Sequence, residues 1–346
     1  MSNLKLKDIA DALKISSATV SKALKGYPDV NPLTRKRVLE YTEKVGFKPQ
    51  HRASSLRTGK SGVIGVILPS LNNLFFLQVL EALVSIAHRE GLLVIPLSSN
   101  EKETSEQQNI DRLVHHGVDA IFLSLSQHST NHQITERLQQ APVPIFLFDK
   151  VSKQLNCPKF FIDDRKAAFE ATQHLIDQGC KRIAHFRISL LAQTSIDRFL
   201  GYREALDMAG LPYDKSLVQV TEKGTSEQGA KFVHSLLQNQ INFDGIFAIN
   251  DELAIGAITA LQEANVLVPE QVAVVGFSNS ELSTIVTPKL SSVDQNPKKM
   301  AEAMLLHYRK YNSQAREEDS QTINNFIIPS SLIVRESSQR IKSSKI

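Results

Sequence analysis

Several features that would point to export, metal binding or catalysis are missing from this 346-residue chain. It has only two cysteines, Cys157 and Cys180, and neither belongs to a C-x-x-C pair, which excludes a disulfide framework and a cysteine zinc site. No run of about 18 apolar residues occurs, and charges interrupt the N-terminal segment where a secretory signal needs an unbroken apolar stretch. We therefore expect a soluble cytoplasmic protein with buried, reduced thiols.

Familiar catalytic motifs are absent as well. The sequence contains no H-E-x-x-H, G-x-S-x-G or G-x-G-x-x-G motif. Gly59-Lys60-Ser61 resembles the end of a phosphate-binding P-loop, but Ser54 stands where the first glycine belongs, and the segment precedes a strand instead of following one. The residues give no indication of an enzyme, a metal site or a cofactor.

The net charge is divided unevenly along the chain. Residues 1–60 hold 13 lysines and arginines against 5 acidic residues, a balance of +8, whereas the remaining residues hold 27 against 31, a balance of −4. A small basic module joined to a mildly acidic body predicts that the module meets a polyanion, while the body has another task.

Residues 6–24 have the pattern of two short helices separated by a turn. In residues 6–13 the apolar side chains recur at i, i+3, i+4 and i+7, which is typical of a helix with one buried face. Ser16 suits the N-cap of a second helix, and Ile15 before it can pack against Val20. This arrangement is the helix-turn-helix, whose second helix enters the major groove of DNA.

The N-terminal residues of that second helix are the predicted base readers. Lys22 can donate hydrogen bonds to guanine, the hydroxyl groups can donate or accept, and Ala18 can contact a thymine methyl group. The residues expected to contact DNA from this region are Ser16, Ser17, Ala18, Thr19, Ser21 and Lys22. Many small helical hairpins share the pattern, so a purely structural hairpin is the alternative.

A third helix is predicted to begin at Pro32. Asn31 can cap it, and Gly46 can end it. Arg35 on this helix can reach a phosphate, and with Asn31 it completes the DNA contacts expected in the headpiece, which we define as residues 1–48.

Residues 49–61 form a polar linker, the hinge, with a helical stretch too short to be stable alone. We expect this stretch to fold on DNA, with Leu56 pushed into the minor groove as an apolar wedge and with Arg52 and Ala53 also in contact. A flexible linker with an incidental leucine is the alternative.

From residue 62 onward, short β-rich runs alternate with amphipathic stretches, as in parallel sheets with helical crossovers. Two series of four strands predict an α/β body of two similar lobes, and segments 160–164 and 288–295 are candidate crossings between them. The expected strands are 63–69, 92–99, 118–126 and 143–149, then 182–189, 217–222, 243–250 and 272–278.

Polar side chains follow these strands at their carboxyl ends, where ligands bind in open α/β sheets. They include Asn73, Asp149 and the pairs Asn250-Asp251 and Ser278-Asn279. Amide, hydroxyl and carboxylate groups that converge with Phe75 suit a polar metabolite such as a sugar. Each of these residues taken alone is more often a helix cap or turn residue.

Over essentially its whole length the chain resembles the lactose/galactose repressor (LacI/GalR) family. The resemblance rests on KDIADALKISSATVSKAL and VNPLTRKRVLEYTEKVGFKPQ in the headpiece, ASSL in the hinge, and NNLFF, RFLGYREAL, FAINDELAIGAI, VPEQVAVVGFSN and PKLSSVDQ in the body. It implies a body with the fold of periplasmic binding proteins, in a homodimer that binds a pseudo-palindromic DNA operator. It also implies an effector that closes the lobes and changes how the hinges are held.

Carried over residue by residue, the resemblance assigns effector contacts to Phe75, Asp149, Arg198, Asn250 and Gln295. The planar fork of Arg198 can hold two adjacent hydroxyls or a carboxylate, while a salt bridge at a helix start is its alternative role. The effector contacts expected in all are Asn73, Phe75, Asp149, Arg198, Asn250, Ser278 and Gln295.

The sequence departs from the family at positions that bear on the ligand. Ser278-Asn279 stands where many sugar-responsive members have two aspartates, Gly224 falls where some have an aromatic residue, and Leu74 replaces a proline. A sugar is expected as the effector, but the standard hexose pocket is not. The final residues RIKSSKI hold no leucine heptad, which argues against an added tetramerisation helix.

We therefore expect a cytoplasmic, nucleoid-associated transcription regulator, with repression as the leading interpretation. A solute-binding protein shares the two-lobed body, but the basic headpiece opposes that reading, and a sugar-metabolising enzyme would leave residues 1–60 without a role. The body should cover residues 62–340, with one lobe from about 62–162 and 294–323 and the other from about 163–291 and 324–340.

Overall fold

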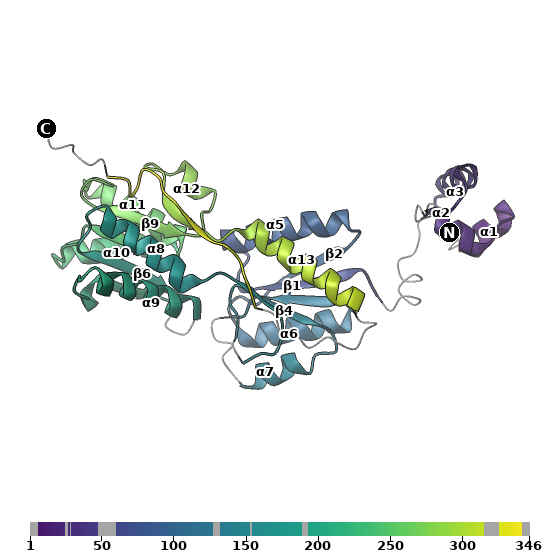
Figure 1. Ribbon diagram of the computed structural model, residues 1–346, viewed down its shortest axis with the longest axis horizontal. Helices are drawn as coiled ribbons and strands as arrows, with labels where there is room; N and C mark the ends of the chain where they lie inside the picture. Colours follow the sequence, from purple (N-terminus) through teal and green to yellow (C-terminus); the bar gives the residue numbers. More distant parts are fainter. Residues whose placement is uncertain are drawn as a thin grey trace. The chain divides into compact units, whose positions relative to one another are not determined.

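The computed structural model describes residues 6–24, 27, 29–47, 60–126, 132–152, 154–188, 193–314 and 325–340 (Figure 1). The chain divides into two compact units, Met1–Ser61, which contains the headpiece, and Gly62–Ile346, the body. Arg52, Ala53 and Leu56 of the hinge lie outside the described residues, so their DNA contacts stay predictions.

The headpiece folds as three helices around a small apolar core. α1 (Leu6–Leu13), α2 (Ser17–Leu24) and α3 (Pro32–Lys44) confirm the three predicted helices. Each helix contributes to the same core, with Ile9, Val20 and Val38 fully buried. Helices this short are marginal in isolation, so each is held by its packing against the other two.

The predicted caps of the headpiece helices are present. The Ser16 hydroxyl accepts a hydrogen bond from the Thr19 N–H at 3.0 Å, and the Asn31 side chain accepts one from the Leu33 N–H at 2.9 Å. Gly46 follows α3 with φ of +63°, a left-handed conformation that glycine adopts without strain. These caps satisfy backbone groups that a helix end leaves unpaired and so fix the helix boundaries.

The body consists of two lobes, each built on a six-stranded sheet (Figure 1). The first sheet has the order β11-β5-β4-β3-β1-β2, and all its strand pairs are parallel. Its strands are β1 (Val63–Leu68), β2 (Leu93–Ser98), β3 (Ala120–Leu123), β4 (Ile145–Phe148), β5 (Lys159–Phe161) and β11 (Asn325–Ile327).

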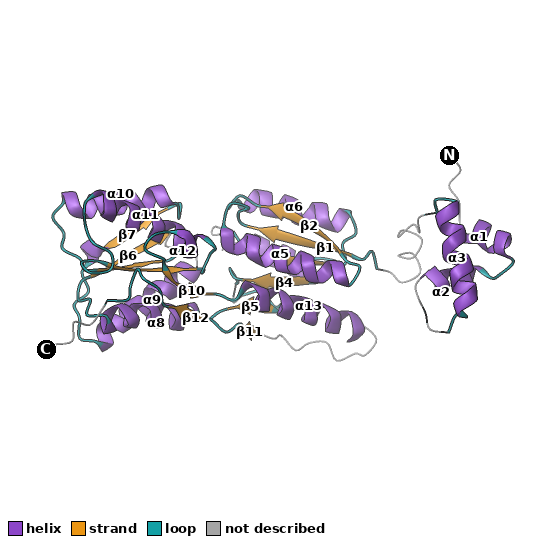
Figure 2. Cartoon of the chain, turned by 90° about the horizontal axis from the view of Figure 1, so that it is seen from above, coloured by secondary structure: helices purple, strands orange, loops and turns teal. Residues whose placement is uncertain are grey.

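Helices cover both faces of the first sheet (Figure 2). They are α5 (Leu74–Arg89), α6 (Glu103–His115), α7 (His132–Gln139) and α13 (Pro297–Gln314). Along β3, Ala120 and Phe122 belong to the core under α5 and α13, whereas Ile121 and Leu123 belong to the core under α6 and α7. This alternation explains why the strand is apolar along its whole length.

The second sheet has the order β12-β10-β9-β8-β6-β7, with parallel pairs except for the antiparallel pair of β10 and β12. Its strands are β6 (Ile183–Ile188), β7 (Val218–Thr221), β8 (Gly245–Ala248), β9 (Ala273–Phe277), β10 (Ser291–Asp294) and β12 (Ser331–Ile333). Its helices are α8 (Asp164–Asp177), α9 (Gln193–Met208), α10 (Ser226–Gln238), α11 (Asp251–Glu263), the short α12 (Leu282–Ile285) and the 3-10 turn η1 (Lys215–Leu217). The predicted two-lobed α/β body is thereby confirmed.

The chain passes between the two sheets three times. The passages follow β5, β10 and β11, at residues 162–163, 295–296 and 328–330. Segments 160–164 and 288–295 therefore both lead into crossings. The expected start of the second lobe at residue 324 is wrong, because Asn325–Ile327 pairs in parallel with β5 and extends the first sheet.

Two glycines allow α10 and α11 to approach each other closely. A Cβ at Gly256 would lie 1.8 Å from the Ser226 carbonyl oxygen, and one at Gly229 would lie 2.1 Å from that of Leu253. Gly256→Ala is therefore expected to lower the free energy of unfolding by about 1–3 kcal/mol, the usual cost of overpacking. Thr259→Ala, at an exposed position of the same helix, should change it little. Equal urea midpoints for the two variants would show that the helices can separate without cost.

Candidate functional site

α2 presents the predicted base-reading residues on the surface of the headpiece. Val20 is buried against the other helices, whereas Ser17, Ala18 and Lys22 are exposed and Ser21 is half-buried. Because the buried and exposed positions lie on opposite sides of α2, the headpiece core leaves these four side chains available to a partner.

Three other predicted DNA contacts take part in helix caps. The Ser16 and Thr19 hydroxyls lie 2.8 Å apart, and the Ser16 hydroxyl also accepts from the Thr19 N–H. Asn31 caps α3. These residues have a local structural role, and their contacts with DNA stay predictions.

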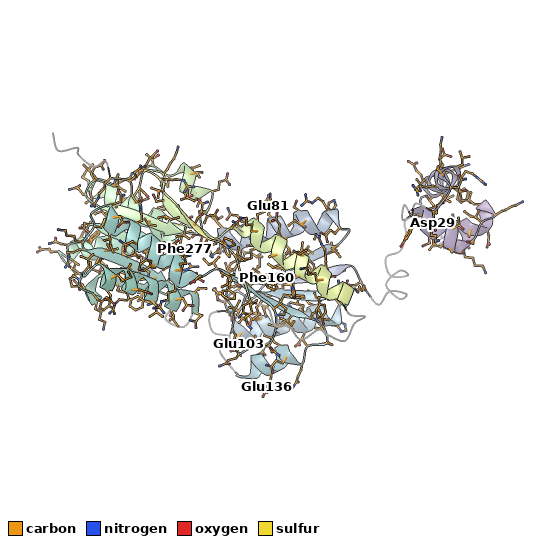
Figure 3. All side chains as sticks on the ribbon, in the orientation of Figure 1. Asp29, Glu81, Glu103, Glu136, Phe160 and Phe277 are labelled. Carbon is orange, nitrogen blue, oxygen red and sulfur yellow. The ribbon has the colours of Figure 1, made fainter. Side chains whose placement is uncertain are left out.

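Two basic side chains, Lys22 from α2 and Arg35 from α3, bond to residues of the turn between these helices. Lys22 Nζ lies 2.5 Å from Asp29 Oδ2, and Arg35 Nη2 donates to the carbonyl of Tyr27. The hydrogen bond to Asp29 raises the pKa of Lys22, and the same bond lowers the pKa of Asp29. Both members of the pair are therefore charged at neutral pH. Asp29 is labelled on the headpiece in Figure 3.

In the body, Arg198 lies at the centre of a buried polar cluster. Its Nε donates to Asp164 Oδ1 at 2.7 Å, and its Nη1 donates to the Ile249 carbonyl at 2.7 Å. Its Cζ lies 3.7 Å from the centroid of the Phe277 ring, which is labelled in Figure 3. Both Arg198 and Asp164 are only 7% exposed. The salt bridge foreseen as the alternative role of Arg198 is therefore present.

Asp149 and Gln295 extend this cluster toward the first lobe. Asp149 follows β4, and its Oδ1 accepts a hydrogen bond from Gln295 Nε2 at 3.3 Å. Burial raises the pKa of Asp149, and the positive charge of Arg198 opposes that shift. We call Asp149, Asp164, Arg198 and Gln295 the Arg198 cluster.

The Arg198 cluster contains two buried carboxyl groups for one guanidinium. Burial raises the pKa of Asp164 to about 7, since the loss of hydration outweighs the attraction of Arg198. Arg198 already uses Nε and Nη1, so a bidentate grip on a ligand would require it to release Asp164 or Ile249. Its Nη2, which has no hydrogen-bond partner within the described ranges, is the nitrogen that it can offer without breaking either bond.

Asp164→Asn is expected to change how stability depends on pH. The folded-state pKa of about 7 lies above the ordinary 3.8, so the folded chain holds an extra proton between these values and loses stability as the pH rises through this window. Asparagine cannot ionise, so the variant should gain on the order of 2 kcal/mol over the native chain between pH 5 and pH 7. Urea unfolding at both pH values measures the gain, and Asp177→Asn, an exposed change on the same helix, is the control. A gain that does not vary with pH would contradict the assignment.

Both polar atoms of the Asn250 side-chain amide form hydrogen bonds with the backbone. Its Oδ1 accepts from the Leu253 N–H at 2.9 Å and caps α11, while its Nδ2 donates to the Gly224 carbonyl at 2.8 Å. A Cβ at Gly224 would lie 2.4 Å from that Nδ2. This contact gives a physical reason why no aromatic side chain stands at Gly224.

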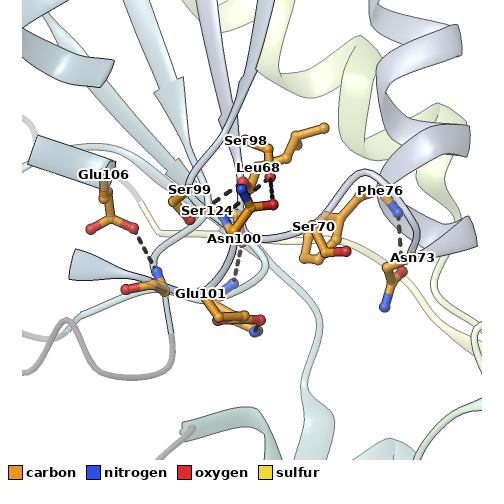
Figure 4. Close-up of polar contacts among 12 residues, drawn as sticks. Leu68, Ser70, Asn73, Phe76, Ser98, Ser99, Asn100, Glu101, Glu106 and Ser124 are labelled. Carbon is orange, nitrogen blue, oxygen red and sulfur yellow. Dashed lines mark hydrogen bonds and ion pairs between the residues drawn. The ribbon is translucent and has the colours of Figure 1, made fainter. Parts of the chain in front are cut away.

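Three further predicted effector residues also have structural roles. Asn73 Oδ1 accepts from the N–H groups of Phe75 at 3.0 Å and Phe76 at 3.4 Å and caps α5 (Figure 4). Phe75 is 3% exposed, and its ring centroid lies 5.4 Å from that of Phe76, so it belongs to the core. Ser278 is buried after β9 with φ of +115°. Contact with an effector stays a prediction for these residues.

Polar side chains at the carboxyl edge of the first sheet bond to one another and to backbone N–H groups (Figure 4). Lys150 Nζ lies 2.5 Å from Glu101 Oε1, and the Lys150 N–H donates to Ser124 Oγ at 3.4 Å. The Ser126 N–H donates to Glu106 Oε2 at 2.6 Å. These bonds connect the loops after β2, β3 and β4 and hold the edge of the sheet on which Asp149 lies.

Neither Asp164 nor Arg335 was predicted from the sequence as a site residue. Asp164 stands in segment 160–164. An acidic residue after a buried strand and at the start of a helix could have indicated a site residue there. Arg335 Nη2 donates to Asn279 Oδ1 at 2.7 Å, and its Nη1 donates to Ser283 Oγ at 3.2 Å. Asn279, which stands where many family members have an aspartate, is thus held by an arginine from near the C-terminus.

Comparisons with known proteins agree with this organisation. Residues 5–50 match the profile of "Bacterial regulatory proteins, lacI family", and residues 61–334 match that of "Periplasmic binding proteins and sugar binding domain of LacI family". The chain belongs to the LacI family. Catabolite control protein A of Priestia megaterium is 33% identical over 294 residues, which are 85% of this chain and 88% of that protein. The ribose operon repressor of Halalkalibacterium halodurans is 27% identical over 336 residues, 96% and 97% of the two chains.

A solved structure of the LacI family has the same fold. The lac repressor dimer bound to operator and the anti-inducer ONPF aligns with a TM-score of 0.82, covering 98% of this chain and 100% of that chain at 20% identity. At this identity the likeness concerns the fold.

This LacI-family chain is a DNA-binding transcription regulator, and the relatives named above are regulators rather than enzymes. Among the described residues, no group of three His, Cys, Asp or Glu side chains could hold a metal ion. No helix in the same ranges is long and apolar enough to cross a membrane.

Proposed function

We propose that this regulator is a homodimeric repressor whose body binds a neutral saccharide and thereby changes the affinity of its headpieces for a pseudo-palindromic operator. The observation that carries the effector half is the Arg198 cluster, which joins strand ends of both lobes. Ligands of open α/β sheets bind at such ends. Because Asp149 belongs to the first lobe and Arg198 to the second, a ligand that contacts both favours the closed arrangement of the lobes.

The chemistry of the cluster favours an uncharged polyhydroxy ligand. Asp149, Asp164 and Gln295 supply mainly acceptor oxygens, and Arg198 supplies the donors. A phosphate or carboxylate on the ligand would face two buried carboxyl groups, whereas a sugar hydroxyl can donate to one and accept from Arg198. The description of the matched family as containing a sugar-binding domain, and the ribose operon repressor among the relatives, support a saccharide.

The DNA half of the proposal rests on the headpiece, residues 1–48, and the hinge, residues 49–61. The +8 balance of residues 1–60 supplies the charge for phosphate contacts, and the exposed end of α2 supplies groups for base edges. In this account Leu56 enters the minor groove from the hinge, with Arg52 and Ala53 beside it, and the body begins at residue 62.

Exposed apolar side chains on the first lobe support a dimer. Leu77 and Val84 on α5 are 38% and 41% exposed, and Leu93 on the adjacent edge strand β2 is 60% exposed. A second copy of the chain would cover these side chains and the open edge of the sheet. The relative whose structure aligns over both units is itself a dimer on its operator.

Two other functions are less well supported. A solute-binding protein shares the body but has no use for a base-reading headpiece. A sugar-metabolising enzyme would need a catalytic group at the strand ends, yet Asp164 is tied to Arg198 and Asn250 is tied to Gly224. A cytoplasmic location, near the nucleoid, follows from the proposed work on DNA.

A mobility-shift assay with DNA from upstream of the chain's own gene tests the proposal at two salt concentrations. Salt-sensitive binding to one fragment, with competition by unlabelled copies of that fragment only, is expected. Failure to select any fragment, with or without candidate saccharides, would overturn the proposal.

A thermal-shift screen identifies the effector. A saccharide at 100 times its dissociation constant should stabilise the body by roughly 2.7 kcal/mol. Stabilisation by sugar phosphates but not by neutral sugars would contradict the proposed ligand chemistry while leaving the DNA half intact.

A further inference from the structure

Asp29 is an isolated negative charge within the DNA-reading part of the headpiece. It is the one acidic residue between Asp11 and Glu40, a stretch that contains six lysines and arginines. It lies in the turn between α2 and α3, next to two residues predicted to contact DNA, Lys22 and Arg35. A carboxylate on a surface that meets phosphates repels them and so weakens DNA binding. Its presence there suggests that it has another role.

Local contacts hold the described residues next to Asp29. Arg35 Nη2 donates to the Tyr27 carbonyl on one side of Asp29, and Asn31 caps α3 on the other. Val30 is buried in the headpiece core. The backbone on either side of Asp29 is therefore held by contacts within the headpiece.

The carboxylate in turn holds Lys22. Lys22 Nζ lies 2.5 Å from Asp29 Oδ2, although the two side chains are 51% and 54% exposed and have room to move apart. A lysine ammonium is a point charge on a flexible stem, so an unrestrained Lys22 would pair with whichever phosphate is nearest. An ammonium that gives one N–H to Asp29 keeps two more for the O6 and N7 atoms of a guanine.

We propose that Asp29 is a positioning residue for base readout, which holds the Lys22 ammonium toward a base edge and keeps it from pairing with the phosphates of random DNA. The inference rests on the proposed DNA-reading role of α2 and deepens it. Sequence discrimination is the ratio of the affinity for the operator to the affinity for random DNA. Asp29 raises that ratio because it weakens binding to random DNA.

The test uses the full chain and two DNA duplexes of equal length. One duplex is enriched by the native chain from a randomised pool, and the other is a scrambled version of it. Fluorescence anisotropy gives the affinity of each duplex over a range of sodium chloride concentrations. The variants are Asp29→Asn, Asp29→Glu and Glu43→Gln. Glu43→Gln removes an exposed acid from α3 and changes the net charge by the same amount as Asp29→Asn.

Asp29→Asn should bind the scrambled duplex about fivefold more tightly at 0.1 M salt, and the logarithmic salt slope should steepen by about 0.9, the value for one added phosphate contact. The ratio of enriched to scrambled affinity should fall about tenfold, the size of one lost base discrimination. Asp29→Glu, which keeps the charge, should retain most of the native ratio of enriched to scrambled affinity. Glu43→Gln should leave it unchanged.

A double-mutant cycle with Lys22→Met shows whether Asp29 acts through Lys22. In the Lys22→Met background, Asp29→Asn should no longer change the ratio, whereas an equal fall in both backgrounds would overturn the inference. Equal effects of Asp29→Asn and Glu43→Gln would also overturn it, because total charge would then explain both. If the native chain enriches no duplex at all, the proposed function fails together with the inference.

Discussion

Arg198→Met is expected to lower the free energy of unfolding of the body by about 3–5 kcal/mol at pH 8, the usual cost of breaking a buried ion pair from one side. Asp164 Oδ1 lies 2.7 Å from Arg198 Nε, and both residues are 7% exposed. Methionine fills similar space but leaves the buried Asp164 carboxyl group without a counter-charge, so this group must either stay ionised and unpaired or take up a proton, and at pH 8 both cost free energy. Urea unfolding of the full chain, followed by far-ultraviolet circular dichroism, measures the loss.

A second substitution separates charge from packing. In the double variant Arg198→Met, Asp164→Asn both charges are gone, so most of the lost stability should return. The single variant should also lose less at pH 5 than at pH 8, since Asp164 has a raised pKa of about 7 even beside Arg198 and protonates at pH 5. Equal losses in the single and double variants, or at both pH values, would assign the effect to packing alone.

Raising the salt concentration from 50 to 200 mM is expected to weaken operator binding by about 10³- to 10⁵-fold, as for a protein with 6–10 phosphate contacts. The +8 balance of residues 1–60 appears twice in a dimer and supplies enough cations for that number. Saccharide affinity should change less than about twofold over the same range, because a buried cluster and an uncharged ligand are only weakly screened. Anisotropy with labelled operator and calorimetry with saccharide measure the two dependences.

Leu56→Ala is the matched variant for that measurement. Leu56 carries no charge, so its loss should lower operator affinity without changing the salt slope. A slope close to zero for the native chain, or a slope that changes with Leu56, would show that the basic residues do not act as phosphate contacts.

The headpiece was predictable because its signals are local. Ser16, Asn31 and Gly46 act within three or four residues of their own positions, and the apolar spacing of residues 6–13 fixes which face of α1 is buried. What the sequence did not indicate is the Lys22–Asp29 pair. The two residues are seven positions apart, and only the packing of α2 against α3 brings them together.

The body was predictable in its class but less so in its connections. Long apolar strands such as β1 stand out in the sequence because both of their faces are buried. β11 is three residues long, with an exposed, half-buried, exposed pattern, and pairs with β5 more than 160 positions earlier. A strand whose place depends on so distant a partner carries little signal of its own, which explains the wrong lobe boundary at residue 324.

The candidate effector site was predicted in part. Asp149, Arg198 and Gln295 were named through the family resemblance, and the structure places them in one cluster. Asn73 and Asn250 show the ambiguity of single polar residues, since an asparagine after a strand can cap the next helix as well as contact a ligand. Asp164 was missed because its pairing with Arg198 is a property of the folded α8 and α9, 34 positions apart in the chain.

The coupling between the two halves of the chain is the central claim, and a reciprocal binding measurement tests it most directly. Operator affinity is measured with and without a saturating saccharide from the thermal-shift screen, and saccharide affinity is measured with and without saturating operator. Linkage requires the same factor in both directions, and we expect about 5- to 150-fold, the usual range of allosteric coupling. Two unchanged affinities with a saccharide that demonstrably binds the body would contradict the account.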